Sequence, residues 1–495
     1  MAVAAPFLGR PVALDLRPIL VAVGVLLVIL ALFMVPPMVA DMAARHPDWQ
    51  VFMAAGAVTL FVGVSLILMN RGYEQAELSG RHAFLMVAAV WVAVTSFASL
   101  PLAFSDLGLT AADAVFEATS GITTTGATVI VGLDVAPPGI LLWRAILQWL
   151  GGIGIIVMGV AIMPILRVGG MQLVRAESSD LSEKILPRAA QIASAIGLIY
   201  FALTVLCAAL YYVAGMAPFE AAAHAMATVA TGGYSTRDAS IGAFADPGTE
   251  LVAIVFMILG SLPFVLYIQA TNGQLRPLFT DAQVRWFFGF IVAFVLPIAL
   301  WLVLVQNVAP HDALRHAAFN VVSIISTTGF ASSDYALWGT FPVAALFFLM
   351  CVGGCTGSTS GGIKIFRFVV LHAIARNQIA RLVRPHGVFV PMFNNRPVPE
   401  AAAIGVMAFV FMFGLSFSVF ALALSLLGLD YLTAMSGALT ALANVGPGLG
   451  EIIGPAGTFS SLPESAKWLL AAAMLLGRLE LFTVLILFTP GFWRH

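Results

Sequence analysis

Four short segments place threonine or other small residues directly before glycine: TTTGAT (123–128), VATGGY (229–234), STTGFA (326–331) and NVGPGL (444–449). A cation that sheds its water needs a ring of oxygen atoms, and backbone carbonyls from four loops can supply one. Glycine permits the backbone angles that turn such carbonyls inward. The sequence therefore predicts a cation filter made of Thr124, Thr125, Gly126, Ala230, Thr231, Gly232, Thr327, Thr328, Gly329, Asn444, Val445 and Gly446.

The elements around these turns repeat. A single Thr-Thr-Gly is a common extracellular turn and carries little weight, but each of the four follows a short helical stretch, at 111–128, 218–236, 312–331 and 431–448. Each stretch is too short to cross a bilayer and lies between two apolar spans, as in a re-entrant hairpin. We expect ten spans, at 18–40, 50–69, 82–104, 138–166, 190–214, 249–271, 283–307, 337–366, 399–427 and 465–489.

Composition places the chain in a membrane. Only 9% of its 495 residues are charged, against about a quarter in soluble domains, and the mean hydropathy is +1.01. Most of the 23 Lys and Arg residues fall on one side of the ten-span arrangement, the side of both termini. The positive-inside rule makes that side cytoplasmic, so the four turns open outward. The net charge of -1 gives no sign of a nucleic-acid partner.

The segment CVGGCTGSTSGGIK (351–364) interrupts an apolar span with residues that cannot hold a helix. Broken backbone at this depth is tolerated only inside protein or beside a water-filled cavity. A flexible loop below the turns could lie across the ion path and swing away. A passive helix break and a phosphate-binding loop are alternatives, although the phosphate motif G-K-[ST] is missing. The predicted gate comprises Gly353, Gly354, Thr356, Gly357, Ser358, Thr359, Ser360, Gly361, Gly362 and Arg478.

Several charged or titratable residues lie within or near the spans. Arg478 falls inside the last span, where a charge is costly and usually functional. It can donate to carbonyls of the loop, or it can form a structural ion pair with a carboxylate of another span. Carboxylates near the turns could concentrate cations at an outer mouth or simply be solvated: Glu117, Glu220, Asp238 and Asp334. We expect His224 to be packed rather than a ligand, and the cysteines Cys207, Cys351 and Cys355 to be small apolar fillers.

The chain resembles the Trk/Ktr/HKT superfamily of potassium transporters, specifically the TrkH type. The resemblance rests on FEATSGITTTGATV (116–129), QWLGGIGIIV (148–157), ATGGYSTRD (230–238), STTGFASSD (326–334), CTGSTSGGIKIFR (355–367), ALTALANVGPGLG (438–450) and GRLELFTVLILFTPGFW (477–493). It implies an all-α polytopic fold with four span–pore-loop–span repeats around a central pore. It also implies two extra N-terminal helices, a homodimer with one pore per subunit, and a cytosolic ring of TrkA-like nucleotide-binding regulatory subunits. Within this superfamily, glycine rather than serine at Gly126 favours potassium.

Together these features predict an N-terminal two-helix domain (1–80) and four pore repeats (81–170, 171–275, 276–390 and 391–495), with a gating loop at 351–362. The expected function is uptake of K⁺ across a bacterial inner membrane, driven by the membrane potential, with both termini cytoplasmic and Rb⁺ also accepted. A symporter coupled to H⁺ or Na⁺ is the alternative. We expect no cofactor other than the transported ion, and no motif of an intramembrane enzyme or an ATPase is present in the sequence.

Overall fold

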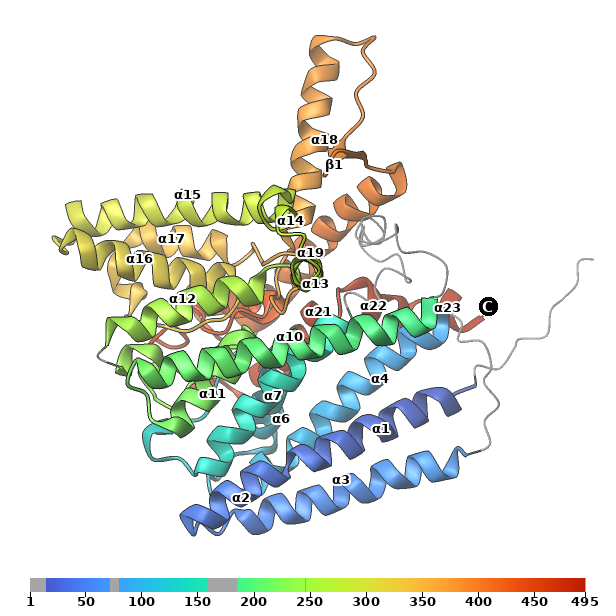
Figure 1. The fold of residues 1–495 in the computed structure, drawn as a ribbon, viewed down its shortest axis with the longest axis vertical. Coiled ribbons are helices and arrows are strands. Elements are labelled where there is room, and N and C mark those ends of the chain that lie inside the picture. The colour runs from blue at the N-terminus through green and yellow to red at the C-terminus, as the bar shows by residue number, and fades with distance from the viewer. Residues whose placement is uncertain (1–14, 72–79, 159–184, 245, 495) are drawn as a thin grey trace, which may run out of the picture.

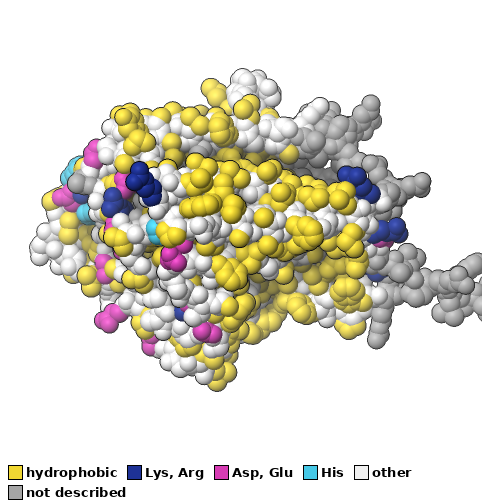
Figure 2. All heavy atoms as spheres, turned by 90° about the horizontal axis from the view of Figure 1, so that it is seen from below, with side chains coloured by type: hydrophobic (Ala, Val, Ile, Leu, Met, Phe, Trp, Pro, Cys, Tyr) yellow, Lys and Arg dark blue, Asp and Glu magenta, His cyan; other side chains and the backbone are white. Residues whose placement is uncertain are grey.

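The computed structural model describes residues 15–71, 80–158, 185–244 and 246–494, and nearly all of its regular structure is helical. Over these ranges the only strands are β1 (Met392–Phe393) and β2 (Arg396–Pro397), which form one short antiparallel pair. Within these described ranges, seven helices are long and apolar enough to cross a membrane, or up to nine if each bent pair counts as one span. Figure 2 shows a broad hydrophobic band between two ends that carry charged side chains. The predicted all-α polytopic membrane fold is confirmed.

The two additional N-terminal spans form an antiparallel pair at the edge of the molecule (Figure 1). The first consists of α1 (Arg17–Phe33) and α2 (Val35–Ala44), and the second is α3 (Trp49–Met69). Pro36 and Pro37 fall in the first turn of α2, where a missing N–H costs nothing. The pair packs against α4 and α7 of the first unit.

The rest of the chain repeats one pattern: a first span, a short buried helix, a turn and a second span, which is broken in the last three units. The first spans are α4 (Gly80–Ala98, extended by α5, Leu100–Ala103), α10 (Ile185–Val213), α15 (Ala282–Leu304) and α19 (Glu400–Leu426). The short helices are α6 (Ala111–Ile122), α11 (Pro218–Val229), α16 (Pro310–Ile325) and α20 (Tyr431–Ala443). They lie at the four re-entrant stretches expected from the sequence.

The starts of the short helices follow from local sequence. The Thr110 hydroxyl caps α6 by accepting a hydrogen bond from the Asp113 N–H at 3.2 Å. The Asp113 carboxylate in turn accepts from the Thr110 N–H, which completes a capping box. Asp430 caps α20 by accepting from the Thr433 N–H at 3.1 Å. Proline begins α11 and α16, because its fixed φ suits the first helical position.

In the second and fourth units, the second span bends sharply at a break. Helix α12 (Pro247–Ser261) meets α13 (Phe264–Thr271) at 92°, and α21 (Glu464–Arg478) meets α22 (Phe482–Leu485) and the 3₁₀ turn at Ile486–Phe488 at 105°. Pro263 sits in the first break, and Glu480 and Leu481, with φ of 61° and 41°, make the second. In the first unit the second span is helix α7 (Pro138–Val157), and its expected continuation to residue 166 lies outside the described residues.

The third unit contains the longest break. Helix α17 (Thr340–Leu349) ends just before the glycine-rich segment, and helix α18 (Ile365–Val383) follows it. In Figure 1, α18 stands at a steep angle to the spans and projects from the body beside β1. The expected span 337–366 is thus a short helix and a buried loop. The remaining helices of the described residues are short: α14 (Arg276–Thr280), α23 (Pro490–Arg494) and the 3₁₀ turns Leu133–Val135, Ser240–Ala243, Tyr335–Trp338 and Phe459–Ser461.

Candidate functional site

The four turns that follow the short helices share one backbone conformation. In each, a residue with left-handed φ is followed by one ordinary residue and then by a glycine with left-handed φ. The first positions are Thr124 (52°), Thr231 (49°), Thr327 (58°) and Asn444 (54°), and the glycines are Gly126 (85°), Gly233 (80°), Gly329 (81°) and Gly446 (116°). Threonine disfavours left-handed φ, so three threonines in this conformation indicate that the surrounding structure holds the backbone in place.

This geometry corrects the sequence alignment of the second turn by one residue. The glycine equivalent to Gly126 is Gly233, not Gly232, and Ala230 is the C-cap of α11 with an ordinary φ of −71°. The backbone bonds agree: Gly232 N–H donates to Ala227 O at 2.8 Å, as Thr125 N–H donates to Ser120 O at 2.8 Å. Sequence comparison missed the shift because Ala-Thr-Gly matches Thr-Thr-Gly in residue type, and the consecutive glycines leave two possible registers.

The turns form a closed ring around a common centre. A Cβ built on Gly126 would collide with the carbonyl oxygen of Gly232. A Cβ built on Gly233 would likewise collide with Thr328 O, and one on Gly329 with Val445 O. A Cβ on Gly446 would lie 2.8 Å from Thr125 O. Each turn therefore places its glycine against a carbonyl of the next turn, in the order first, second, third, fourth and back to the first. Only glycine fits both the φ and the close approach.

A buried ion pair supports the first turn from behind. Arg144 Nε of α7 lies 2.8 Å from Glu117 Oε1 of α6, and both side chains are at most 1% exposed. Glu117 also accepts the Val129 N–H at 2.9 Å, and Arg144 donates to Ser235 O at 2.8 Å and lies over the Tyr234 ring. The sequence suggested that Glu117 lines an outer mouth or is solvated. Both interpretations are wrong, because Glu117 is buried and paired with Arg144. It joins the first and second turns.

The other carboxylates near the turns also have protein partners. Asp238 accepts from the Gly132 and Leu133 N–H groups at 3.1 and 2.9 Å, and Asp334 accepts from Ala336 N–H at 3.0 Å. Glu220 pairs with Arg237 at 2.6 Å. His224 is buried, with its ring nitrogens 2.8 Å from Glu220 O and 2.9 Å from Ser235 Oγ, so it is packed as expected.

The glycine-rich loop lies directly against the turns. Thr231 Oγ1 donates to Thr359 Oγ1 at 2.9 Å, and Gly361 N–H donates to Thr327 Oγ1 at 2.6 Å. Gly361 also lies against Ala443 and Asn444 of the fourth turn. The loop is held on its other side by the break of α12, since Cys355 N–H donates to Ser261 O at 2.9 Å. It therefore fills the space where the turns of three units converge.

Arg478 ties the remaining turn to the same loop. One of its terminal nitrogens donates to Thr124 Oγ1 at 2.5 Å and to Thr359 O at 2.9 Å, and the side chain is buried. Lys364, at the end of the loop, donates to Ser360 O. Both cations line a small cavity of about 30 Å³ together with Glu480 and residues of the loop. The expected contact between Arg478 and loop carbonyls is present, and Arg478 has no ion-pair partner among the described carboxylates.

The pairing of Glu480 was not foreseen from sequence. Its carboxylate forms an ion pair with the guanidinium of Arg367 on α18, which is fully buried and lies 3.5 Å over the Phe409 ring of α19. This pair links the break of the fourth unit to the first turn of α18. The position of Arg367, a few residues after the loop, was the one sequence feature that could have indicated such a pair. Only the bend after α21 shows that Glu480 turns toward it.

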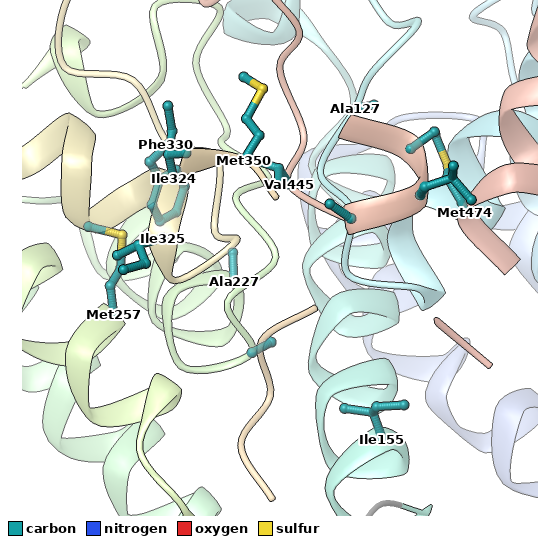
Figure 3. Close-up of a cluster of buried hydrophobic side chains, with 14 of the residues drawn as sticks. Ala127, Ile155, Ala227, Met257, Ile324, Ile325, Phe330, Met350, Val445 and Met474 are labelled. Carbon is teal, nitrogen blue, oxygen red and sulfur yellow. The ribbon is translucent and has the colours of Figure 1, made fainter. Parts of the chain in front are cut away.

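Apolar packing surrounds the ring. Figure 3 shows side chains that pack there, with Ile324, Ile325 and Phe330 from the third unit and Val445 from the fourth. All four are at most 1% exposed. A closely packed apolar wall of this kind restricts movement of the turns and lowers the local dielectric.

Comparisons with known proteins agree with the fold. The chain is 47% identical over 479 residues to the Trk system potassium uptake protein TrkI of Halomonas elongata, covering 97% of each chain. It is 40% identical over 485 residues to the Trk system potassium uptake protein TrkH of Escherichia coli, covering 97% of this chain and 99% of that one.

A solved structure and a family model extend the match. The crystal structure of the potassium transporter TrkH from Vibrio parahaemolyticus superposes with a TM-score of 0.90 at 37% identity, over 97% of this chain and all of that one. The model of the TrkH family, described as a cation transport protein, matches residues 48–494. The resemblance found in the motifs is thereby confirmed, and the chain belongs to the TrkH family of cation transport proteins.

Proposed function

We propose that this protein takes up potassium through the ring formed by its four turns. The observation that carries the proposal is the closure of that ring, in which the glycine of each turn lies against a carbonyl of the next. Four extended turns with left-handed glycines give a cation a surround of backbone oxygens. The proteins of this family named above are potassium uptake proteins, which supports K⁺ as the ion. Rb⁺, with similar chemistry, should also pass.

The filter in this proposal uses the register of the structure. Its residues are Thr124, Thr125, Gly126, Thr231, Gly232, Gly233, Thr327, Thr328, Gly329, Asn444, Val445 and Gly446. The short helices end at these turns, so their partly negative C-terminal ends point at the site and favour a cation. Gly126 keeps the first turn free of a hydroxyl that would intrude on the neighbouring carbonyl, which supports selectivity for potassium over sodium.

The loop at 351–362 acts as the gate. Its hydrogen bonds to Thr231 and Thr327 support a closed state in which the loop blocks the path below the ring. Arg478 and Lys364 add two positive charges beside the same path, which raises the barrier for a passing cation. Opening requires the loop to leave these contacts, and Gly361 and Gly362 supply the hinge.

Transport is driven by the membrane potential, worth about 2.3 kcal/mol per charge per 100 mV. The competing mechanism, coupling to H⁺ or Na⁺, would need a titratable carboxylate on the path. Glu480 is the one carboxylate that lines the cavity in the described part of the chain, and it is already paired with Arg367. Uptake of Rb⁺ into proteoliposomes under voltage alone separates the two mechanisms.

The protein works as a homodimer in a bacterial inner membrane, with both termini in the cytoplasm and a TrkA-like nucleotide-binding ring below. The basic segment 376–386 on and after α18 offers a cytoplasmic surface for that ring, while the second basic segment, 167–175, lies outside the described residues. Because α18 follows the loop directly, a ring docked there can pull on Gly361 and Gly362. Co-purification with the regulatory subunit, followed by flux with and without nucleotide, tests this assignment.

A further inference from the structure

A second and larger pocket lies at the base of the projecting helix α18. It has a volume of about 800 Å³, and its wall is formed by α13, α14, the start of α15, one face of α18 and the segment around β1. It shares no residue with the cavity below the ring. Neither the filter nor the gate uses it.

Two arginines and one carboxylate line the pocket, so its wall carries a net positive charge. Arg285 of α15 and Arg376 of α18 both line it, and neither forms an ion pair with any carboxylate that the structure describes. The one acidic residue in the wall, Asp281, is already engaged: its Oδ1 accepts the Gln283 N–H at 2.7 Å and its Oδ2 accepts from Asn394 at 2.8 Å. The pocket is therefore suited to an anion.

The pocket wall also contains a hydrogen-bond donor, on Asn377, without an acceptor in the described part of the chain. The side-chain nitrogen of Asn377 is buried and has no hydrogen-bond partner among the described residues. A buried donor left without an acceptor costs about 1–3 kcal/mol. Oxygen atoms of a phosphate between Arg285 and Arg376 would supply both the charge and the acceptor. His372, whose ring lies 5.1 Å from that of Trp286, adds a further polar edge.

The surroundings of the pocket favour a lipid over a soluble anion. Arg285 lies in the first turn of a spanning helix, and the residues that continue its face, Phe288, Val292 and Leu296, are 43%, 53% and 58% exposed. Trp286, beside it, is a side chain typical of the membrane interface. A ligand held here would have its charge in the pocket and apolar chains along this exposed stripe.

We propose that this pocket binds the head group of an anionic phospholipid, with its phosphate between Arg285 and Arg376 and its acyl chains along α15. The inference uses the orientation proposed above, in which this end faces the cytoplasmic leaflet, where basic pockets between spans meet anionic head groups. A lipid bound here touches α18, the helix that continues from the loop. It would therefore hold the base of α18 in place without contacting the ring.

The test is lipid retention by the intact purified protein, measured by native mass spectrometry after addition of phosphatidylglycerol, cardiolipin or phosphatidylcholine. The double variant Arg285→Gln/Arg376→Gln is compared with Arg71→Gln/Arg384→Gln, which removes the same charge from exposed arginines outside the pocket. The expected result is about 25-fold weaker retention of the anionic lipids in the first variant only. Phosphatidylcholine should bind weakly to all forms.

Three outcomes would overturn the proposal. Equal retention of anionic lipid by both double variants would place the lipid elsewhere. Displacement of the lipid by millimolar inorganic phosphate or ADP would show that the pocket binds a soluble phosphate. Dissociation of a dimer in the first variant, with lipid retention unchanged in the remaining monomer, would show that a second copy covers the pocket. Since retention is measured without flux, failure here is distinct from failure of the proposed potassium function.

Discussion

The hydroxyl of Thr231 donates to the hydroxyl of Thr359 across 2.9 Å, so the second turn and the intramembrane loop are in direct contact although 128 residues separate them. Thr359 also donates to Val229 O and Gly260 O, at 3.2 and 3.0 Å. One side chain of the loop thus holds the end of a short helix, a turn and the break of a span. The loop and the ring therefore pack together as one structural unit.

Thr359→Val keeps the shape of this side chain and removes its hydrogen bonds to the turn and to the break. We expect a severalfold rise in Rb⁺ uptake with unchanged selectivity, because the closed position of the loop is weakened while the ring keeps its backbone. Ser358→Ala is the matched control, since the Ser358 hydroxyl donates only within the loop, to Cys355 O. An equal effect of both substitutions would show that the contact with the turn is not what holds the loop.

Deletion of residues 356–361 removes half of the loop at 351–362. Flux should rise, and the preference for Rb⁺ over Na⁺ should stay, because the deletion lies below the ring. Size-exclusion chromatography identifies folded dimers before flux is measured. Lower flux from a folded, dimeric deletion protein would mean that the loop is structural and not a gate.

Replacing a ring glycine by serine should weaken the selectivity for Rb⁺ over Na⁺. Gly126→Ser and Gly233→Ser each place a Cβ against a carbonyl of the next turn, at a φ of 85° or 80° that serine disfavours. Rb⁺ uptake measured with excess Na⁺ should fall severalfold relative to wild type in both variants. The second variant also checks the register, because the sequence alone assigned that role to Gly232.

Gly232→Ala is the comparison. Its Cβ would meet the side-chain amide of Gln148 rather than a backbone carbonyl of the next turn, and the φ of Gly232 is not left-handed. We therefore expect a smaller loss of selectivity than in Gly233→Ser. If Gly232→Ala is the more damaging of the two, the register of the second turn is the one expected from sequence and the ring described here is misplaced by one residue.

The ion pair between Arg367 and Glu480 gives a stability prediction. Glu480→Gln leaves a buried arginine without its counter-charge, and such a loss typically destabilises a protein by about 3–5 kcal/mol. The double variant Arg367→Met/Glu480→Leu removes both charges and should recover most of the thermal stability. Melting temperatures in detergent give the comparison. A double variant no more stable than Glu480→Gln would show that the charges do not act as a pair.

Regulation by a separate subunit predicts that the purified protein alone does not respond to nucleotide. Flux should change with ATP, ADP or NADH only after the TrkA-like partner of the same organism is added. The chain itself offers helices and one short strand pair over its described residues, with no nucleotide-binding fold. Nucleotide-dependent flux from this chain alone, or a stable failure to bind any such partner, would contradict the proposal.

The fold was largely predictable because its signals are local. Apolar runs mark the spans, and proline or a capping residue marks the starts of α6, α11, α16 and α20. The loop was predictable as well, since five glycines in fourteen residues cannot remain helical inside an apolar span. The four similar turns, each between two apolar spans, then gave the order of the repeats.

The rest depends on contacts between distant residues. The register of the second turn is set by φ at Thr231 and Gly233, which two adjacent glycines leave open in the sequence. The burial of Glu117 depends on Arg144 approaching from α7, and the pairing of Glu480 depends on a 105° bend after α21. None of these follows from residue type or spacing along one element.

The central claim is that a cation passes through the ring under voltage alone. The direct measurement is Rb⁺ uptake into proteoliposomes that carry an inside-negative potential and no gradient of H⁺ or Na⁺. At 100 mV, we predict accumulation approaching about 50-fold in vesicles with the wild-type protein and none in empty vesicles. Rb⁺ that enters only after an H⁺ or Na⁺ gradient is imposed would contradict this account and establish coupled transport instead.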